Sequence, residues 1–377
     1  MIARKLPFIV GGLCAASASS FAQVPDLLNA LDAGGRAMGV GGSLYATGAD
    51  TLSSYYNPAG LGYLNQGAFG VAYRNFPTSS SSASDEFGDL ELDSRGRRGG
   101  SSISHAGLAY PLNQGRMGTL AVSYTVGGFI DDSRTNGGVL VGGNPVNFYR
   151  ESVKAKSDYF TLAYGKASSD QSFSWGVGLQ YVRQRIANEI LLVDSGNNTL
   201  IDADFDETGN GLGFVAGFQW IPKSNPNMSF GLSYRSEIDL NDNEDTAALY
   251  DKIPARLLGG IAYRQDGLRG GRDFIVYGAQ LQHFFAGEDS QVFDRQNQST
   301  FGFGLEYSYQ TQGFRIPIRL GYQLVPGGGE DFGPRNAFTF GFGYRPNDNR
   351  FGIDLNFASP EKGGYDMGIS LNYRLGK

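Results

Sequence analysis

Reactive side chains are scarce in this sequence of 377 residues, which contains one cysteine and two histidines. Cys14 has no second cysteine to pair with, which excludes a disulfide framework. His105 and His283 each lie in a predicted strand, and no nucleophile elbow accompanies them. We therefore expect no enzymatic activity, no metal site built on these residues and no cofactor.

Long apolar runs are also missing. No stretch approaches the roughly 18 apolar residues of a membrane-spanning helix, and the mean hydropathy is −0.26. This value does not exclude a membrane β-barrel, because alternating apolar and polar residues average to near neutrality. The net charge of −6 disfavours nucleic acid as a partner. Glycine (56 residues) and aromatic residues (13%) are abundant instead, which is typical of many aromatic-rich strands.

The N-terminus has the pattern of a secretory signal peptide. Arg4 and Lys5 precede a short apolar run, and Ser20-Phe21-Ala22 offers small residues for cleavage after Ala22. The run is too short to span a bilayer. Residues 1–22 are therefore predicted to be a signal peptide, with a buried N-terminal helix as the alternative.

Most of the remaining sequence alternates with a period of two. In "FTFGFGYR" the residues Phe338, Phe340, Phe342 and Tyr344 share one face, and threonine and glycine occupy the other. Similar segments predict about fourteen strands of roughly ten residues each. Their expected spans are 67–77, 102–112, 117–130, 152–166, 172–187, 210–221, 228–240, 254–265, 273–285, 299–310, 314–325, 335–345, 350–358 and 365–376.

The predicted connections alternate between long and short. Short ones such as "NQGR" and "PNDN" follow even-numbered strands, and long polar ones follow odd-numbered strands. Outer-membrane barrels have short periplasmic turns and long outer loops. We therefore predict an all-β fold, a transmembrane antiparallel β-barrel of about 14 strands at residues 67–377. A soluble β-sandwich is the alternative, but it does not explain this alternation of loops.

Five Tyr-Arg pairs recur near the ends of predicted strands. Alternation directs each tyrosine outwards, where its ring can lie at the level of the lipid headgroups, and each arginine inwards. Most of these arginines are expected to be simply solvated. The pairs are Tyr73-Arg74, Tyr234-Arg235, Tyr263-Arg264, Tyr344-Arg345 and Tyr373-Arg374.

Residues 23–66 are too irregular and glycine-rich to form barrel wall. A barrel of about fourteen strands is too wide for its own side chains to fill, so we expect this segment to lie inside the lumen. Asn57-Pro58 favours a turn within it, because Pro58 restricts both residues.

The stretch "NPAGL" (57–61), behind the lead "GRAMGVGGS", resembles the N-terminal hatch of the FadL-type outer-membrane transporter family. This resemblance implies a hatch at residues 23–66 that fills the barrel, with Asn57, Pro58 and Ala59 as gating residues. In that family a kink in the third strand opens the wall sideways. The glycine pair Gly127-Gly128 can produce such a bulge, so these two residues are assigned to a lateral opening; a simple strand end is the alternative.

The resemblance implies passive uptake of hydrophobic small molecules, such as long-chain fatty acids, across the bacterial outer membrane. The implied partners are outer-membrane lipid, a hydrophobic ligand and the barrel-assembly machinery. The same lead also resembles the PorV-like barrels of a secretion system, so a structural or secretion-associated barrel that docks exported proteins stays open. A surface calcium site in the acidic stretch 202–211 also stays open, because Asp202, Asp204 and Asp206 are spaced two residues apart, although no glutamate stands where an EF-hand loop would close.

Overall fold

The computed structural model describes residues 34–87, 90–141, 144–194, 198–240, 252–285, 297–324, 336–360 and 365–375. The predicted signal peptide and residues 23–33 of the predicted hatch lie outside these ranges, so both stay predictions. Fourteen antiparallel strands close into a barrel in which the first strand pairs with the last. Among the described residues, no helix is long and apolar enough to cross a membrane.

Each of the fourteen predicted strands corresponds to one strand of the barrel wall. The wall strands are β1 Gly67–Phe87, β2 Leu90–Pro111, β3 Thr119–Val141, β4 Asn144–Ala167, β5 Phe173–Asp194, β6 Thr199–Trp220, β7 Met228–Arg235, β10 Arg256–Gly267, β11 Asp273–Phe284, β12 Gln298–Gln310, β13 Phe314–Leu324, β14 Ala337–Pro346, β15 Phe351–Pro360 and β16 Asp366–Leu375. A one-turn helix, α4 Leu268–Gly271, joins β10 to β11.

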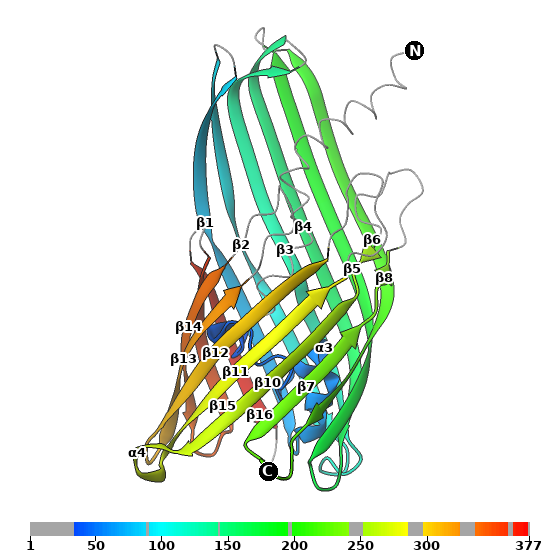
Figure 1. Cartoon of the computed structure of the whole chain (residues 1–377). Helices are drawn as coiled ribbons and strands as arrows, with labels where there is room; N and C mark the ends of the chain where they lie inside the picture. The colour runs from blue at the N-terminus through cyan, green and yellow to red at the C-terminus, as the bar shows by residue number, and fades with distance from the viewer. Residues whose placement is uncertain are drawn as a thin grey trace.

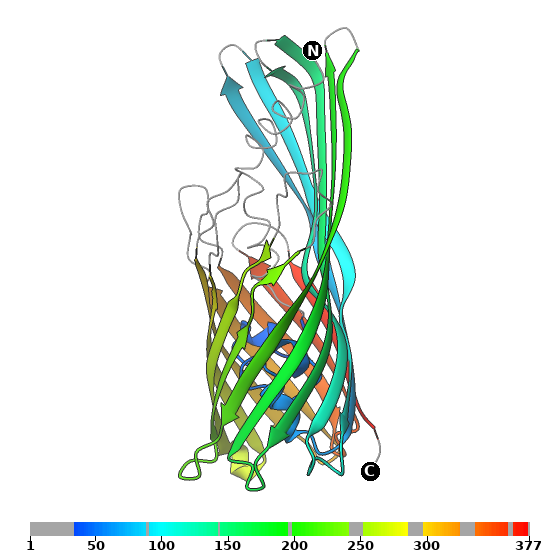
Figure 2. The same cartoon turned by 90° about the vertical axis from the view of Figure 1, so that its right-hand side faces the viewer.

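The predicted strand length of roughly ten residues is wrong for the first six strands. These strands have 21 to 24 residues, whereas the other eight have 8 to 13. The segments expected to be long loops after β1, β3 and β5 are largely continuations of the strands. Figures 1 and 2 show the six strands rising together beyond the rest of the barrel. The extensions are rich in serine, glycine and charge, so they lack the apolar face on which the strand prediction depended.

The outer and inner faces of the wall differ as the alternation predicts. Along β14, Phe338, Phe340, Phe342 and Tyr344 are exposed outwards, while Thr339 is buried on the inner side. β5 repeats this with Trp175, Val177, Leu179 and Tyr181 outside and Gln180 buried inside. An uninterrupted apolar outer face of this kind is suited to hydrocarbon.

Inside the barrel lies the plug segment, residues 34–66, drawn in blue in Figure 2. It contains two short 3-10 helices and one helical turn: η1 Met38–Val40, α3 Ser53–Tyr56 and η2 Pro58–Tyr63. A two-stranded sheet, β8 Ile238–Asp239 with β9 Lys252–Ile253, adds apolar side chains to the same interior core. Residues 34–66 of the predicted hatch therefore lie inside the lumen, where the sequence predicts them.

Three of the five Tyr-Arg pairs correct the expectation of solvated arginines. Arg74 forms an ion pair with Asp366 at 2.9 Å, and Arg345 forms one with Asp354 at 2.6 Å. Arg235 is fully buried against tyrosine rings. The wide lumen is filled by the plug segment, so inward-pointing arginines meet protein rather than water.

The acidic stretch that might have bound calcium is part of strand β6. Asp202, Asp204 and Asp206 are exposed, and Asp206 is hydrogen-bonded to Arg185 on the neighbouring strand. Within the described ranges, no group of three or more potential metal-ligating side chains is present.

Candidate functional site

The plug segment packs directly onto the backbone of the barrel wall at inward-facing glycines. A side chain on Gly231 would collide with the Ala46 carbonyl, and one on Gly176 would collide with Pro58. On the other side of the lumen, Gly321 lies against the backbone of Gly41. Only glycine allows this approach, because any Cβ would occupy the space of plug backbone atoms. Wall glycines therefore give the plug segment its close fit.

Asn57, Pro58 and Ala59 lie at the junction between α3 and η2, buried against the wall. The Asn57 side chain donates to the carbonyls of Ala46 (2.7 Å) and Phe218 (3.2 Å) and accepts from the Ala59 amide (3.2 Å). The Ala59 carbonyl accepts from Ser174 Oγ at 2.7 Å. Pro58 is the first residue of η2, where its fixed φ suits a helix start. The three residues thus connect the aromatic turn α3 to the wall.

Replacing Asn57 by alanine is expected to lower the free energy of unfolding by about 1–3 kcal/mol, because the carbonyls of Ala46 and Phe218 each lose one hydrogen bond and the Ala59 amide loses its acceptor; Ala46 keeps the bond from Gln219. Urea unfolding of the folded barrel in detergent measures this change. Asn210→Ala is the matched control, because Asn210 only accepts a hydrogen bond from the exposed Tyr181 hydroxyl. The control should stay within about 0.5 kcal/mol of the parent; equal losses in the two variants would contradict a structural role for Asn57.

Four tyrosines and two arginines form a buried aromatic–arginine cluster between the plug segment and strands β4, β7 and β10. The rings of Tyr45 and Tyr56 stack with centroids 3.9 Å apart, and Tyr55 meets Tyr159 edge-on at 5.0 Å. Arg235 donates to the hydroxyls of Tyr55 and Tyr159, both at 3.2 Å. The second guanidinium, that of Arg256, lies 5.1 Å from the ring centres of both Tyr55 and Tyr56.

The pairing between β2 and β3 is interrupted next to this cluster. Arg98 pairs with Asp132, and His105 pairs with Thr125, in the same register. Residues 99–104 and 126–131, all within the described ranges, form no pairs with each other between these two points. The gap in the β2–β3 ladder is therefore a local separation within an otherwise continuous pair of strands.

Gly127 forms a β-bulge at the edge of this gap. The pairing of β3 with β4 shifts between Val126 and Gly128, which leaves Gly127 as the extra residue. A side chain on Gly127 would collide with the Tyr159 ring and approach the Tyr55 hydroxyl. The glycine pair does not end the strand, which continues to Val141. The structure thus brings Gly127 to the aromatic–arginine cluster, with Gly128 next to it in the strand, whereas Pro58 lies against Gly165 and Gly176, nearer the short-turn end of the barrel.

His105 links the plug segment to the lower edge of the gap. Its Nδ1 lies 3.0 Å from Thr125 Oγ1 on β3, and its Nε2 lies 3.0 Å from Thr51 Oγ1 in the plug segment. Sequence reasoning found no role for His105. The structure gives it a structural one, at the last residue pair before the ladder separates.

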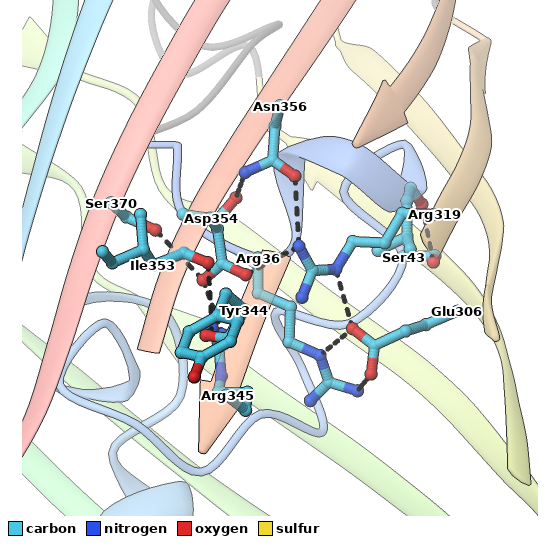
Figure 3. Close-up of polar contacts among 12 residues, drawn as sticks. Arg36, Ser43, Glu306, Arg319, Tyr344, Arg345, Ile353, Asp354, Asn356 and Ser370 are labelled. Atoms are coloured by element: carbon cyan, nitrogen blue, oxygen red, sulfur yellow. Dashed lines mark hydrogen bonds and ion pairs between the residues drawn. The ribbon is translucent and has the colours of Figure 1, made fainter. Parts of the chain in front are cut away.

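A buried charge network fastens the plug segment on the opposite side of the lumen (Figure 3). Arg36 binds Glu306 through two hydrogen bonds of 2.7 and 2.9 Å. Arg319 contacts Glu306 at 2.7 Å and Asp354 at 2.8 Å, and Arg345 completes the chain at Asp354. Asn356 donates to the Gly35 carbonyl at 3.0 Å. Of these residues only Arg345 was singled out from the sequence, as part of a Tyr-Arg pair, although charged residues on a face otherwise made of glycine and serine were a usable signal for Glu306 and Asp354.

Comparisons with known proteins give structural matches alone. No protein-family model and no curated protein matches the sequence. The Ralstonia pickettii toluene transporter TbuX superposes with a TM-score of 0.61 at 16% identity, covering 92% of this chain and 99% of that one. The P. putida toluene transporter TodX gives 0.58 at 13% identity, covering 89% and 100%. A Pseudomonas aeruginosa FadL homologue gives 0.56 at 15% identity, covering 92% and 98%.

These matches confirm the predicted fold. The chain has a closed fourteen-stranded barrel like those of FadL-type channels, with exposed apolar side chains around its outer face. A closed barrel leaves no unpaired edge inside hydrocarbon, so its place is the bacterial outer membrane.

Proposed function

We propose that this chain, which has the fold of FadL-type outer-membrane channels, lets hydrophobic small molecules pass from the outside into the membrane through the side of its wall. The observation that carries this proposal is the gap in the β2–β3 ladder beside the Gly127 bulge. The structural neighbours described as toluene transporters support the choice of cargo. Long-chain fatty acids and monoaromatic hydrocarbons are the two cargo classes to test.

The aromatic–arginine cluster is the part of the interior that such a molecule would meet beside the gap. Tyr55 lies against Gly127, so a molecule that displaces this ring reaches the interrupted ladder. Both Tyr55 and Tyr56 are buried, at 1% and 0% exposure, so passage requires α3 to move. Asn57, Pro58 and Ala59 form the junction on which α3 would turn, because Ala59, at the start of η2, is held to the wall by Ser174. This placement is the reason for assigning the gating role to these three residues.

A reversible crosslink across the gap tests the lateral route. If the register continued, Ser102 would face Gly128, so a double variant with cysteines at these positions can be bridged by a bifunctional methanethiosulfonate reagent. Uptake of labelled oleate and toluene is measured in Gram-negative cells that lack a transporter of this type. The crosslink should reduce uptake at least about tenfold, which corresponds to 1.4 kcal/mol in the barrier, and a reductant should restore it.

The matched control places cysteines at Leu108 and Val122, which pair in the intact part of the same two strands. This crosslink should leave uptake unchanged. Full uptake with the Ser102–Gly128 bridge in place would exclude the lateral route. If both crosslinked variants lost uptake, the loss would result from a general stiffening of the wall and not from closure of the gap.

One observation favours a second candidate, a secretion-associated barrel that docks exported proteins. Six neighbouring strands project beyond the rest of the barrel on the long-loop side (Figures 1 and 2), which provides a large outer sheet. Shortening the β1–β2 and β3–β4 hairpins above residues 98 and 132 separates the two candidates. A channel should keep its uptake after this deletion, whereas a docking barrel should lose its bound protein.

A further inference from the structure

A cavity lies on the other side of the plug segment, at the short-turn end of the barrel that faces the periplasm. Its volume is about 450 Å³, within the range of small-molecule sites. The plug segment contributes Arg36 and residues 47–51 to its wall, and the periplasmic ends of β7 and β10 to β16 contribute most of the rest. It is thus separate from the gap in the β2–β3 ladder and from the aromatic–arginine cluster.

The cavity is cationic in a protein whose overall charge is −6. Two acids, Asp50 and Glu306, line it together with six arginines: Arg36, Arg264, Arg315, Arg319, Arg345 and Arg374. Acids just outside the cavity, Asp354 and Asp266, neutralise part of this charge. The arginines still outnumber all four acids, so the cavity has a surplus of positive charge.

Arg315 is the least compensated of these arginines. Its Nε is buried without a hydrogen-bond partner, and no carboxylate pairs with its guanidinium among the described residues. Arg315 and Arg264 both lie over the ring of Phe274, at 5.4 and 3.9 Å from its centre. A guanidinium stacked on a ring keeps its N–H edge free for a planar anion. Two guanidinium groups are thus held on one ring. Arg264 donates to Asp266 at 2.8 Å, whereas the Nε of Arg315 has no acceptor among the described residues.

Apolar side chains form much of the remaining cavity wall. Leu44, Ala262, Val276 and Pro317 line it together with Phe274. A fully hydrated anion such as phosphate gains no binding free energy from such a surface, whereas an organic anion can bury its apolar part there. An uncompensated arginine beside an apolar wall therefore favours a ligand that carries both a negative charge and an apolar group.

We propose that this cavity is a periplasm-facing binding site for a small carboxylate that carries an apolar or aromatic group, with Arg315 and Arg264 as its anion-binding residues. The carboxylate binds at the free Nε edge of Arg315, and the apolar group packs against Phe274, Val276 and Leu44. The site goes beyond the lateral channel proposed above and does not depend on it, because the plug segment separates the two.

Benzoate binding to the purified full chain in a non-ionic detergent tests this site. Calorimetric titration should detect benzoate, while its neutral counterpart benzamide should bind at least about tenfold more weakly, as expected when a charge-assisted hydrogen bond is lost. Phosphate should bind at least about tenfold more weakly than benzoate because it lacks the apolar group. Equal binding of benzoate and benzamide, or of benzoate and phosphate, would overturn the proposal.

Arg315→Gln and Arg264→Gln should each weaken benzoate binding about tenfold or more. Arg315→Lys should recover part of the affinity because it keeps the charge but not the planar fork. Arg116→Gln is the matched control, since Arg116 is exposed in a turn at the same end of the barrel and outside the cavity. Heat-modifiable migration on gels verifies that each variant is folded. Unchanged benzoate binding in folded Arg315→Gln would exclude this residue as the anion-binding group.

Discussion

Replacing Arg319 by methionine is expected to lower the free energy of unfolding by about 3 kcal/mol, because two buried carboxylates each lose one of their two arginine partners, while Glu306 keeps Arg36 and Asp354 keeps Arg345. Arg319 is 1% exposed, and it contacts both Glu306 and Asp354. Methionine has a similar length and keeps most of the packing, so the loss reports mainly on the charges. Guanidinium chloride unfolding of the barrel in lipid vesicles measures the effect.

The matched control for this prediction is Arg185→Met. Arg185 also pairs with a carboxylate, that of Asp206, but both residues are exposed. An exposed ion pair contributes between about 0 and 1 kcal/mol, so the control should remain close to the parent. If Arg319→Met and Arg185→Met destabilise the barrel equally, the network in Figure 3 does not hold the plug segment in place.

Replacing Gly231 by alanine is expected to push the plug segment off the wall and to open the lumen to ions. The new Cβ would occupy the position of the Ala46 carbonyl oxygen, and a backbone atom cannot move aside as a flexible side chain can. Overpacking of this kind costs about 1–3 kcal/mol. A barrel of fourteen strands without its plug is wide enough for water. Single-channel recordings in planar bilayers should therefore show conductance that the parent lacks.

Gly259→Ala is the matched control on the next strand of the wall. Its Cβ would meet only the Leu232 side chain, at 3.4 Å, on the outward-facing side. This variant should remain as closed as the parent. A closed Gly231→Ala barrel with a native plug segment would mean that the wall glycines are not required for the fit.

The barrel was predictable because its energetics are local and periodic. The outward series from Phe338 to Tyr344 identifies β14 without any knowledge of its neighbours, since lipid selects apolar residues at every second position. The upper halves of β1 to β6 were not predictable in this way. They are polar and glycine-rich, so alternation of apolar residues has no signal there, and the pairing of long neighbouring strands decides their conformation.

Part of the candidate functional site was also predictable, because it depends on a local sequence pattern. The glycine pair Gly127-Gly128 indicated a bulge because glycine weakens a strand wherever it occurs, and the bulge is present at Gly127. In contrast, Arg36 and Glu306 are 270 positions apart in the sequence. Their contact arises only when the barrel has closed around the plug segment, so no local pattern reveals it. Arg264 and Arg315 likewise meet at Phe274 only when the barrel has formed, so no local pattern predicts this contact either.

For the lateral route proposed above, the height of the gap in the β2–β3 ladder determines which leaflet of the membrane would receive the cargo. Strand β3 begins at Thr119 at the periplasmic end, and a tilted strand needs roughly 9–11 residues to cross the hydrocarbon. The unpaired positions that begin at Val126 therefore start in the outer half of the hydrocarbon and reach its outer boundary by Asp131. A molecule released there would still have to diffuse across to the inner leaflet, down its own concentration gradient.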